Sequence, residues 1–274
     1  MSETIATFFV EIFLEHDPGP GHPERVERLE AVRTALNAEG PDSLEWVLPG
    51  PASLEDLERI HENHYVAHVS AQRGRSVWLD PDTALSPASV DAAWRAAGAG
   101  VQAVQGLVEG HFSRALVLPR PPGHHAERAR ARGFCVFSNL AIAAAHARSV
   151  LGLERILVID WDVHHGNGTQ HAFEADPGVL FFDTHQHPLF PGSGLAGECG
   201  QGEGAGYTIN LPLPPRTRDA DLAGIYESWL VPLAEEYRPQ LVLVSAGFDG
   251  HARDPVGSME LSVEGFAHLC GQAR

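Results

Sequence analysis

Short runs of hydrophobic residues alternate along this chain with longer segments in which hydrophobic residues recur every three or four positions. The run at 156–159 contains only β-branched and aliphatic residues, which is typical of a strand buried on both faces of a parallel sheet. We predict strands at six such runs: 5–14, 115–118, 156–160, 179–182, 207–211 and 241–244. The longer segments predict helices at about 26–36, 54–69, 88–108 and 139–150, at 221–237 with a kink at Pro232, and from Ser262 onward.

This alternation of strand and helix predicts an α/β fold in which helices flank a mostly parallel, doubly wound sheet. Two segments rich in proline and glycine, 16–25 and 79–87, are expected to be loops. Ser86 and Pro87 are expected to cap and begin the helix that follows. Because the chain shows no internal repeat and no interdomain linker, we expect one domain over residues 1–274.

Composition narrows the classes of function. The formal net charge of −17 argues against a non-specific nucleic-acid binder, since such a protein needs a basic surface. The three cysteines, Cys135, Cys199 and Cys270, stand far apart, which fits a reducing cytoplasm and argues against a disulfide framework. No run approaches the roughly 18 apolar residues of a membrane span, so we expect no membrane partner.

Polar residues follow three of the predicted strands. Asp160 ends the strand at 156–160, and Asp162 and His164 follow it. Side chains alternate along an extended segment, so these three should point the same way. Asp249 follows the strand at 241–244, and the carboxyl ends of parallel strands share one edge. Asp162, His164 and Asp249 would then supply three ligands to one divalent ion, which leaves room for water and substrate, as in catalytic zinc sites.

His124 and His125 follow the strand at 115–118 and would lie at the same edge. One would deprotonate a metal-activated water and the other would assist the leaving group. Asp160 and Asn167 would hold the imidazoles by hydrogen bonds. Phe134 and Phe190 stand in glycine-flanked loops and could wall a tunnel, although isolated phenylalanines more often belong to a core.

Several motifs carry a resemblance to a known family. The segments R-P-P-G-H-H-A, G-F-C-V-F-S-N, V-I-D-W-D-V-H-H-G-N-G-T-Q, H-Q-H-P-L-F-P-G-S-G and S-A-G-F-D-G-H-A-R-D-P-V-G are similar to the histone deacetylase superfamily. That family includes lysine deacetylases, bacterial deacetylase-like amidohydrolases and acetylpolyamine amidohydrolases. The resemblance covers nearly the whole chain in the right order, and Asn167 is similar to the class II members.

The resemblance implies the arginase/deacetylase-like fold and a hydrolase that removes an acetyl group from acetyl-lysine or an acetylpolyamine. It implies one catalytic Zn2+ at Asp162, His164 and Asp249, with His124 and His125 as the acid/base pair. It further implies that Gly133, Phe134 and Phe190 line the acyl channel and that Asp82, at the channel rim, binds the substrate backbone. Asp160 and Asp183 would contribute to a structural K+ site.

One departure concerns a Gly-Gly-Tyr motif that the family carries downstream of the last metal ligand. The chain stops at Arg274 without it, and Tyr207, Tyr226 and Tyr237 lie in the wrong context to replace it. We therefore expect a C-terminally incomplete catalytic domain without the last strands of the family sheet. Losing such an electrophilic donor typically costs about 10²–10³ in rate.

Two other functions are alternatives to deacylation. A catalytically impaired module that binds acyl-lysine or a partner would fit the missing tyrosine. An arginase-like binuclear manganese hydrolase would need further bridging carboxylates, and Gly247 stands where one would be required. The sequence leaves open the acyl-amine substrate, the acyl chain, the oligomeric state and the choice between zinc, iron and cobalt.

Overall fold

The computed structural model describes residues 4–40 and 43–274, and the chain divides into two compact units, Met1–Gly152 and Leu153–Arg274. Both units contain parallel sheets with helices packed against them, which confirms the predicted α/β class. The expectation of one domain over residues 1–274 stays a prediction.

The first unit is built on a parallel sheet with the strand order β2–β1–β5 and on an antiparallel hairpin, β3–β4. The strands are β1 (Ile5–Phe8), β2 (Leu44–Val47), β3 (Val77–Asp80), β4 (Thr83–Leu85) and β5 (Ala115–Val117). The helices are α1 (Ile12–Glu15), α2 (Val26–Glu39), α3 (Leu54–Glu58), α4 (Asn63–Ser70), α5 (Ser89–Val108) and α6 (Asn139–Ser149). Alanines along one side of α5 pack against Phe8 of β1 in the core of this unit.

The first unit corrects several local predictions. The predicted strand at 5–14 ends at Phe8, and its second half begins α1. The predicted loop at 79–87 contains the end of β3, the turn and all of β4, because Asp80 pairs with Thr83 across a tight hairpin. Ser86 does not cap α5: the helix begins at Ser89, and the Ser86 backbone N–H donates to the Ser89 hydroxyl.

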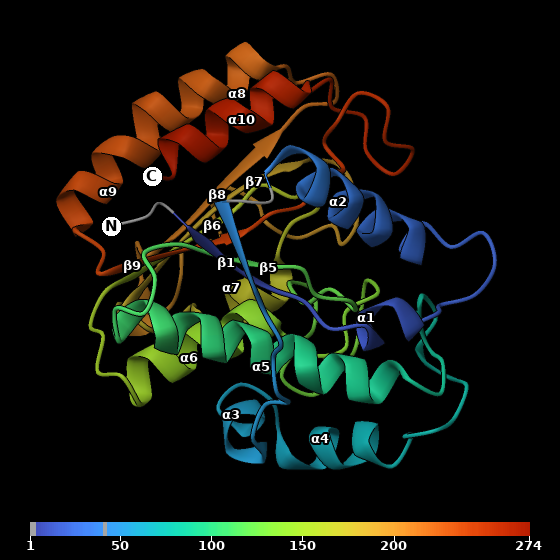
Figure 1. Ribbon diagram of the computed structural model, residues 1–274. Coiled ribbons are helices and arrows are strands. Elements are labelled where there is room, and N and C mark those ends of the chain that lie inside the picture. Colours follow the sequence, from blue (N-terminus) through green and yellow to red (C-terminus); the bar gives the residue numbers. More distant parts are fainter. Residues whose placement is uncertain (1–3, 41–42) are drawn as a thin grey trace. The chain divides into compact units, whose positions relative to one another are not determined.

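The second unit contains a four-stranded parallel sheet with the order β8–β7–β6–β9. Its strands are β6 (Ile156–Asp160), β7 (Val179–Gln186), β8 (Thr208–Leu213) and β9 (Leu241–Ser245). Its helices include α7 (Asn167–Phe173), α8 (Asp219–Ile225), α9 (Val231–Tyr237) and α10 (Val263–Gln272). Figure 1 shows α8 and α9 end to end, with α10 beside α8, and their apolar residues share one core with alternate residues of β6 and β7.

The helical segment 219–237 changes its winding in the middle. A π-helical turn, Tyr226–Leu230, joins α8 to α9, and Pro232 falls in the first turn of α9. Proline cannot donate a backbone hydrogen bond and crowds the preceding turn of an α-helix, so a wider turn directly before it relieves both problems. The irregularity predicted at Pro232 is therefore present as a change of helix type.

Strand β6 fixes the position of the candidate metal ligands. All five of its residues are buried, as expected for a strand with neighbours on both sides. In the parallel register Asp160 pairs with Asp183 of β7 and with Ser245 of β9. The carboxyl ends of these strands therefore deliver their loops to one edge.

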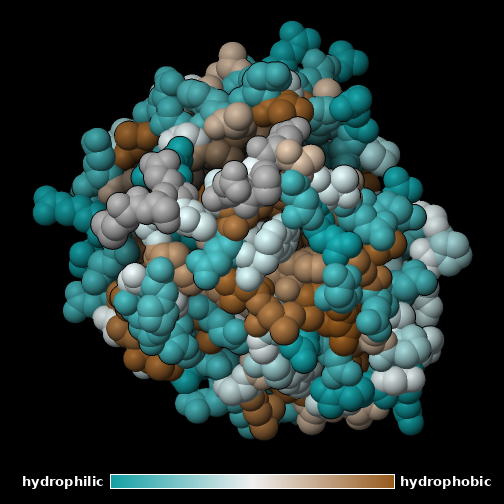
Figure 2. Space-filling model, viewed as in Figure 1, coloured by the Kyte–Doolittle hydropathy of each residue, from teal (hydrophilic) through white to brown (hydrophobic). Residues whose placement is uncertain are grey.

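The surface in Figure 2 combines both kinds of residue: polar residues cover much of the face in view, and hydrophobic residues form patches between them. The most exposed large hydrophobic side chains include Leu48, Trp78 and Val263. Among the described residues, no helix has both the length and the apolar character needed to cross a bilayer.

Candidate functional site

Asp162, His164 and Asp249 bring their ligand atoms together in the second unit. Asp162 and His164 lie in the loop after β6, and Asp249 lies in the loop after β9, the adjacent strand. One ligand atom from each lies within 4.8 Å of the others. The Nδ1 atom of His164 is 3.0 Å from Oδ1 of Asp162 and 3.0 Å from Oδ2 of Asp249. The structure thus assembles the trio that the sequence singled out.

The electrostatics of this trio favour a positive charge at its centre. Burial alone lowers the pKa of His164, but hydrogen bonds and charges from Asp162 and Asp249 outweigh it and raise that pKa to about 9. Burial and the neighbouring Asp162 charge raise the pKa of Asp249, because two carboxylates share a small volume. A divalent cation would supply the positive charge, and carboxylate oxygens with an imidazole nitrogen form a suitable donor set.

Gly247 provides the space that the Asp162 side chain occupies. A Cβ atom built on Gly247 would lie 2.6 Å from Cγ of Asp162 and would overlap its carboxylate. Any larger residue would displace this ligand, so the close approach requires glycine. Glycine at this position also offers no carboxylate for a second metal ion.

Carboxylates also hold the loop that carries the ligands. Asp160 accepts a hydrogen bond from the Asp162 backbone N–H at 3.1 Å, and Asp162 accepts one from the His164 N–H at 2.8 Å. Asp249 uses Oδ1 to accept from the Val163 N–H at 2.9 Å, while its Oδ2 faces His164. The loop geometry is therefore fixed by the same carboxylates that form the candidate metal site.

Asp160 and Asp183 are fully buried carboxylates at paired positions of β6 and β7. Both approach Gly166, whose backbone N–H donates to Asp183 Oδ2 at 2.8 Å. The other oxygen of Asp183 lies 2.7 Å from Nδ1 of His185. Asn167, the first residue of α7, is also buried and directly follows Gly166 in the sequence. These positions fit a polar structural site beneath the ligand loop, and the roles expected for Asp160 and Asn167 stay predictions.

Phe190 stands beside the candidate metal ligands. Its ring centroid is 6.2 Å from that of His164, with the ring planes at 72°, and the residue is 36% exposed. An aromatic side chain beside a candidate metal ligand that also reaches solvent is suited to line an entrance, and the channel role of Phe190 stays a prediction.

His124 and His125 lie side by side in the first unit. They follow the Arg120–Gly123 segment after β5, and their ring centroids are 3.9 Å apart. His125 is buried, whereas His124 is half-buried. Gly133 packs against the His125 ring, because a Cβ atom built on Gly133 would lie 2.8 Å from Cγ of His125. The structure thus joins two predicted catalytic residues to a predicted channel residue.

Asp82 contacts the predicted channel residue Gly133 directly, and its neighbour Thr83 contacts Phe134. Its Oδ1 atom accepts a hydrogen bond from the Gly133 backbone N–H at 3.0 Å and one from the Thr83 hydroxyl at 2.8 Å. Thr83 in turn accepts from the Phe134 backbone N–H at 3.2 Å. These contacts do not test the predicted binding of substrate by Asp82. They show that residues 82 and 83 hydrogen-bond the Gly133–Phe134 turn, which the sequence did not reveal.

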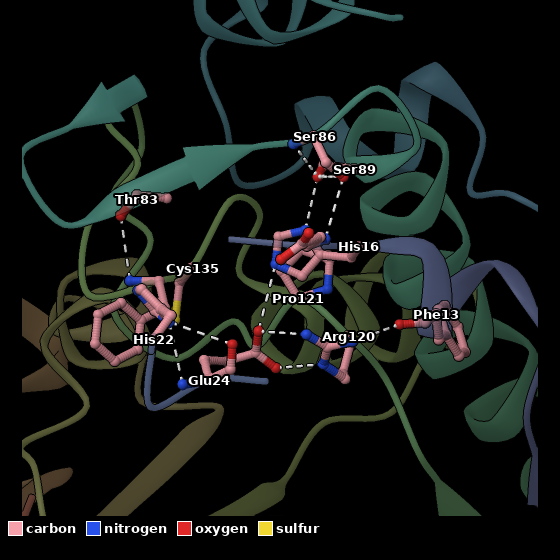
Figure 3. A network of polar contacts seen from close by, with 12 residues as sticks. Phe13, His16, His22, Glu24, Thr83, Ser86, Ser89, Arg120, Pro121 and Cys135 are labelled. Atoms are coloured by element: carbon pink, nitrogen blue, oxygen red, sulfur yellow. Dashed lines mark hydrogen bonds and ion pairs between the residues drawn. The ribbon is translucent and has the colours of Figure 1, made fainter. Parts of the chain in front are cut away.

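A buried ion pair between Arg120 and Glu24, which the sequence did not predict, connects the segment before His124 to the N-terminal loop. Arg120 donates to Glu24 from Nε at 2.5 Å and from Nη2 at 2.8 Å, and to the Phe13 carbonyl at 2.9 Å. His16 lies 3.4 Å from the same carboxylate and bonds the Ser89 hydroxyl (Figure 3). Burial favours protonation of Glu24, but its bonds to His16 and Arg120 outweigh this and lower its pKa to about 2.

His61 is a second residue that the sequence analysis missed. Its Nδ1 atom lies 2.9 Å from the Glu127 carbonyl, and its Nε2 accepts from the Ser138 N–H at 2.9 Å. A carbonyl only accepts, so Nδ1 carries the proton and the ring is neutral. Burial lowers the pKa of His61 to about 4, which agrees with this assignment. His61 therefore joins the two ends of the loop that contains Gly133 and Phe134.

Comparisons with known proteins agree with this arrangement. Residues 22–273 match the family model described as "Histone deacetylase domain". A "Probable deacetylase" of Archaeoglobus fulgidus is 40% identical over 268 residues, which cover 97% of this chain and 74% of that protein. The human "Polyamine deacetylase HDAC10" is 43% identical over 262 residues, covering 90% of this chain and 39% of that protein.

A solved structure shares the fold at high similarity. The crystal structure of the HDA15 HD domain superimposes with a TM-score of 0.93 at 32% sequence identity. The match covers 98% of this chain and 80% of that chain. The chain spans well under half the length of the human relative, so the activity of that whole protein does not transfer directly.

Proposed function

This chain belongs to the histone deacetylase domain family, and on that premise we propose that it is a zinc-dependent hydrolase that removes an acyl group from an amine. The observation that carries the proposal is the convergence of Asp162, His164 and Asp249 in a cradle that Gly247 leaves open. An acetylated lysine in a peptide or protein, or an acetylpolyamine, is the proposed substrate. The relatives named deacetylase and polyamine deacetylase support this choice of amine.

Asp162, His164 and Asp249 would hold one Zn2+ ion. When bound, zinc lowers the pKa of water and polarises the substrate carbonyl. The protein's contribution is to hold two carboxylates and one imidazole close together, so that they bind the ion without rearrangement. The buried Asp160 and Asp183 would supply part of a structural K+ site.

His124 and His125 would move the protons of the reaction. One accepts a proton from the attacking water, and the other donates a proton to the amine nitrogen as the amide bond breaks. We propose that Asp160 and Asn167 orient these imidazoles, since a fixed tautomer determines which ring nitrogen accepts.

Gly133, Phe134 and Phe190 would line the acyl channel, and Asp82 would lie at its rim. Glycine at 133 leaves space next to His125, while the two aromatic rings would exclude water from the acyl chain. We propose a cytoplasmic location and no direct nucleic-acid partner, because the chain is strongly acidic and its cysteines are isolated.

The test is deacylation of acetyl- and trifluoroacetyl-lysine peptides and of N-acetylputrescine, after metal removal and after zinc addition. The chain itself contains no lysine, so every acetyl-lysine signal comes from the added substrate. Asp162→Asn should abolish zinc-dependent turnover, while Asp91→Asn, the same change at an exposed pair with Arg73, should keep it. Turnover that survives Asp162→Asn would refute the assignment, and hydroxamate binding without turnover would favour a binding module.

A further inference from the structure

We propose that Asp82 and Thr83 are positioning residues that orient the His125 imidazole through the turn at Gly133 and Phe134. This inference rests on the proposed function, because it assigns His125 a catalytic role. The contacts that support it all lie within the first unit.

The turn is a tight one, and its second central residue, Phe134, is not one that such a turn favours. The Arg132 and Cys135 backbones exchange hydrogen bonds at 3.1 and 2.9 Å, so Gly133 and Phe134 are the two central residues. Both have positive φ, 56° and 68°. Positive φ at both central positions is the mark of a type I′ turn, which normally takes glycine, asparagine or aspartate. Phenylalanine rarely adopts this conformation, so contacts outside the turn must stabilise it.

The hairpin β3–β4 supplies those contacts. Asp82 accepts the Gly133 N–H and the Thr83 hydroxyl with the same carboxylate oxygen, and Thr83 accepts the Phe134 N–H. Both amides of the strained turn therefore bind consecutive residues of one hairpin. Thr83 is almost fully buried, and a dashed line in Figure 3 marks the hydrogen bond at its hydroxyl.

The turn passes this constraint to His125. A Cβ atom on Gly133 would lie 2.8 Å from Cγ and 3.0 Å from Cβ of His125, so the Gly133 backbone forms a wall of the imidazole pocket. On the other side of the turn, the His22 ring packs edge-to-face on Phe134 with centroids 4.4 Å apart. If the turn loses its conformation, the Gly133 backbone shifts away from His125 and the imidazole can adopt other orientations.

This role predicts a different kinetic signature from a grip on substrate. A carboxylate that binds the substrate backbone contributes binding, so its loss raises KM. A residue that orients a proton carrier acts on the chemical step, so its loss lowers kcat at nearly constant KM. The conservative Asp82→Asn change keeps an acceptor oxygen for the Gly133 N–H and therefore should restore the geometry.

The experiment compares Asp82→Ala, Asp82→Asn and Thr83→Val with wild type on whichever acyl-amine the wild type hydrolyses. Asp82→Ala and Thr83→Val should lower kcat by about 10- to 100-fold with little change in KM. Asp82→Asn should retain most of kcat, and Asp91→Asn should behave as wild type. A rise in KM at unchanged kcat, or no change in Asp82→Ala, would overturn the proposal.

A second readout does not depend on activity. In Asp82→Ala the Gly133 and Phe134 amides should exchange with solvent faster, and the His125 ring signals in NMR spectra should shift. Unchanged exchange and ring signals would refute the positioning role even if the wild type proves inactive. An inactive wild type alone would refute the proposed function, so the two failures are distinguishable. Melting temperatures of the variants identify any general loss of folding.

Discussion

Breaking the buried Glu24–Arg120 pair should destabilise the protein strongly. Arg120→Met keeps a side chain of similar length but leaves the buried Glu24 carboxylate without its two guanidinium bonds. The side chains are only 4% and 5% exposed, so water does not replace the lost partner. Removing one member of such a pair costs about 3–5 kcal/mol, because the remaining charge is buried and uncompensated.

The pKa of Glu24 reports its whole environment, in which burial raises the pKa but hydrogen bonds and charges from His16 and Arg120 lower it more. It falls from an ordinary value of 4.5 to about 2 in the folded protein. Each unit of pKa corresponds to about 1.4 kcal/mol, so the environment stabilises the ionised carboxylate by about 3 kcal/mol. Arg120 supplies only part of this stabilisation, because His16 remains beside the carboxylate when Arg120 is replaced, so the lower end of the range applies. We therefore expect Arg120→Met to lower the free energy of unfolding by about 3 kcal/mol and Tm by at least about 6 °C.

Urea unfolding followed by circular dichroism measures this loss. The control is Arg218→Met, because Arg218 pairs with Glu260 through a side chain that is 71% exposed, and exposed pairs contribute about 0–1 kcal/mol. Glu24→Leu combined with Arg120→Met removes both charges and should recover part of the loss. If Arg120→Met matches Arg218→Met within about 1 kcal/mol, the pair does not stabilise the loop as argued.

Two further predictions follow from single residues. The stabilisation from the ionised Glu24 carboxylate should be complete above pH 4.5 and should disappear as the pH falls toward about 2, because its pKa is lower in the folded than in the unfolded protein. Between pH 6 and 2.5 the free energy of unfolding should therefore fall more steeply in wild type than in Glu24→Gln. Parallel curves would contradict this. Gly247→Ala should weaken zinc binding by about 10- to 100-fold in a competitive chelator titration, because the added methyl group displaces the Asp162 carboxylate. The control variant Gly224→Ala should bind zinc normally, because a methyl group there meets no atom within 4 Å. Equal affinities in the two glycine variants would refute the steric argument.

The metal ligands were predictable because their positions depend on strand ends. Asp162 and His164 follow a strand that its hydrophobic run identifies, and parallel pairing then brings Asp249 to the same edge. Strand β2 was missed because its sequence, Leu-Glu-Trp-Val, is short and half-exposed and shows no hydrophobic run. Sequence periodicity therefore identified the buried centre of the second unit better than the edge of the first.

Partnerships between distant loops could not be predicted in the same way. Glu24 and Arg120 are 96 positions apart, and neither lies in an element whose period would pair them. The turn at Gly133 and Phe134 has phenylalanine where such a turn usually takes glycine or asparagine, and its amides bind Asp82 and Thr83, 51 positions earlier. Such contacts are properties of the folded loops, and neither the glycine-flanked position of Phe134 nor the resemblance to a family revealed them.

Some of the acidic side chains have a structural role that the net charge alone conceals. Loops lack the regular backbone bonds of helices and sheets, so their N–H groups need other acceptors. Carboxylates provide them next to both groups of candidate catalytic residues: Asp82 for Gly133, Asp160 for Asp162, and Asp249 for Val163. Glu198 likewise accepts the N–H groups of Gly194 and Leu195. These acids are committed to shaping loops, so the charge of −17 overstates the negative surface that remains to attract a cationic substrate.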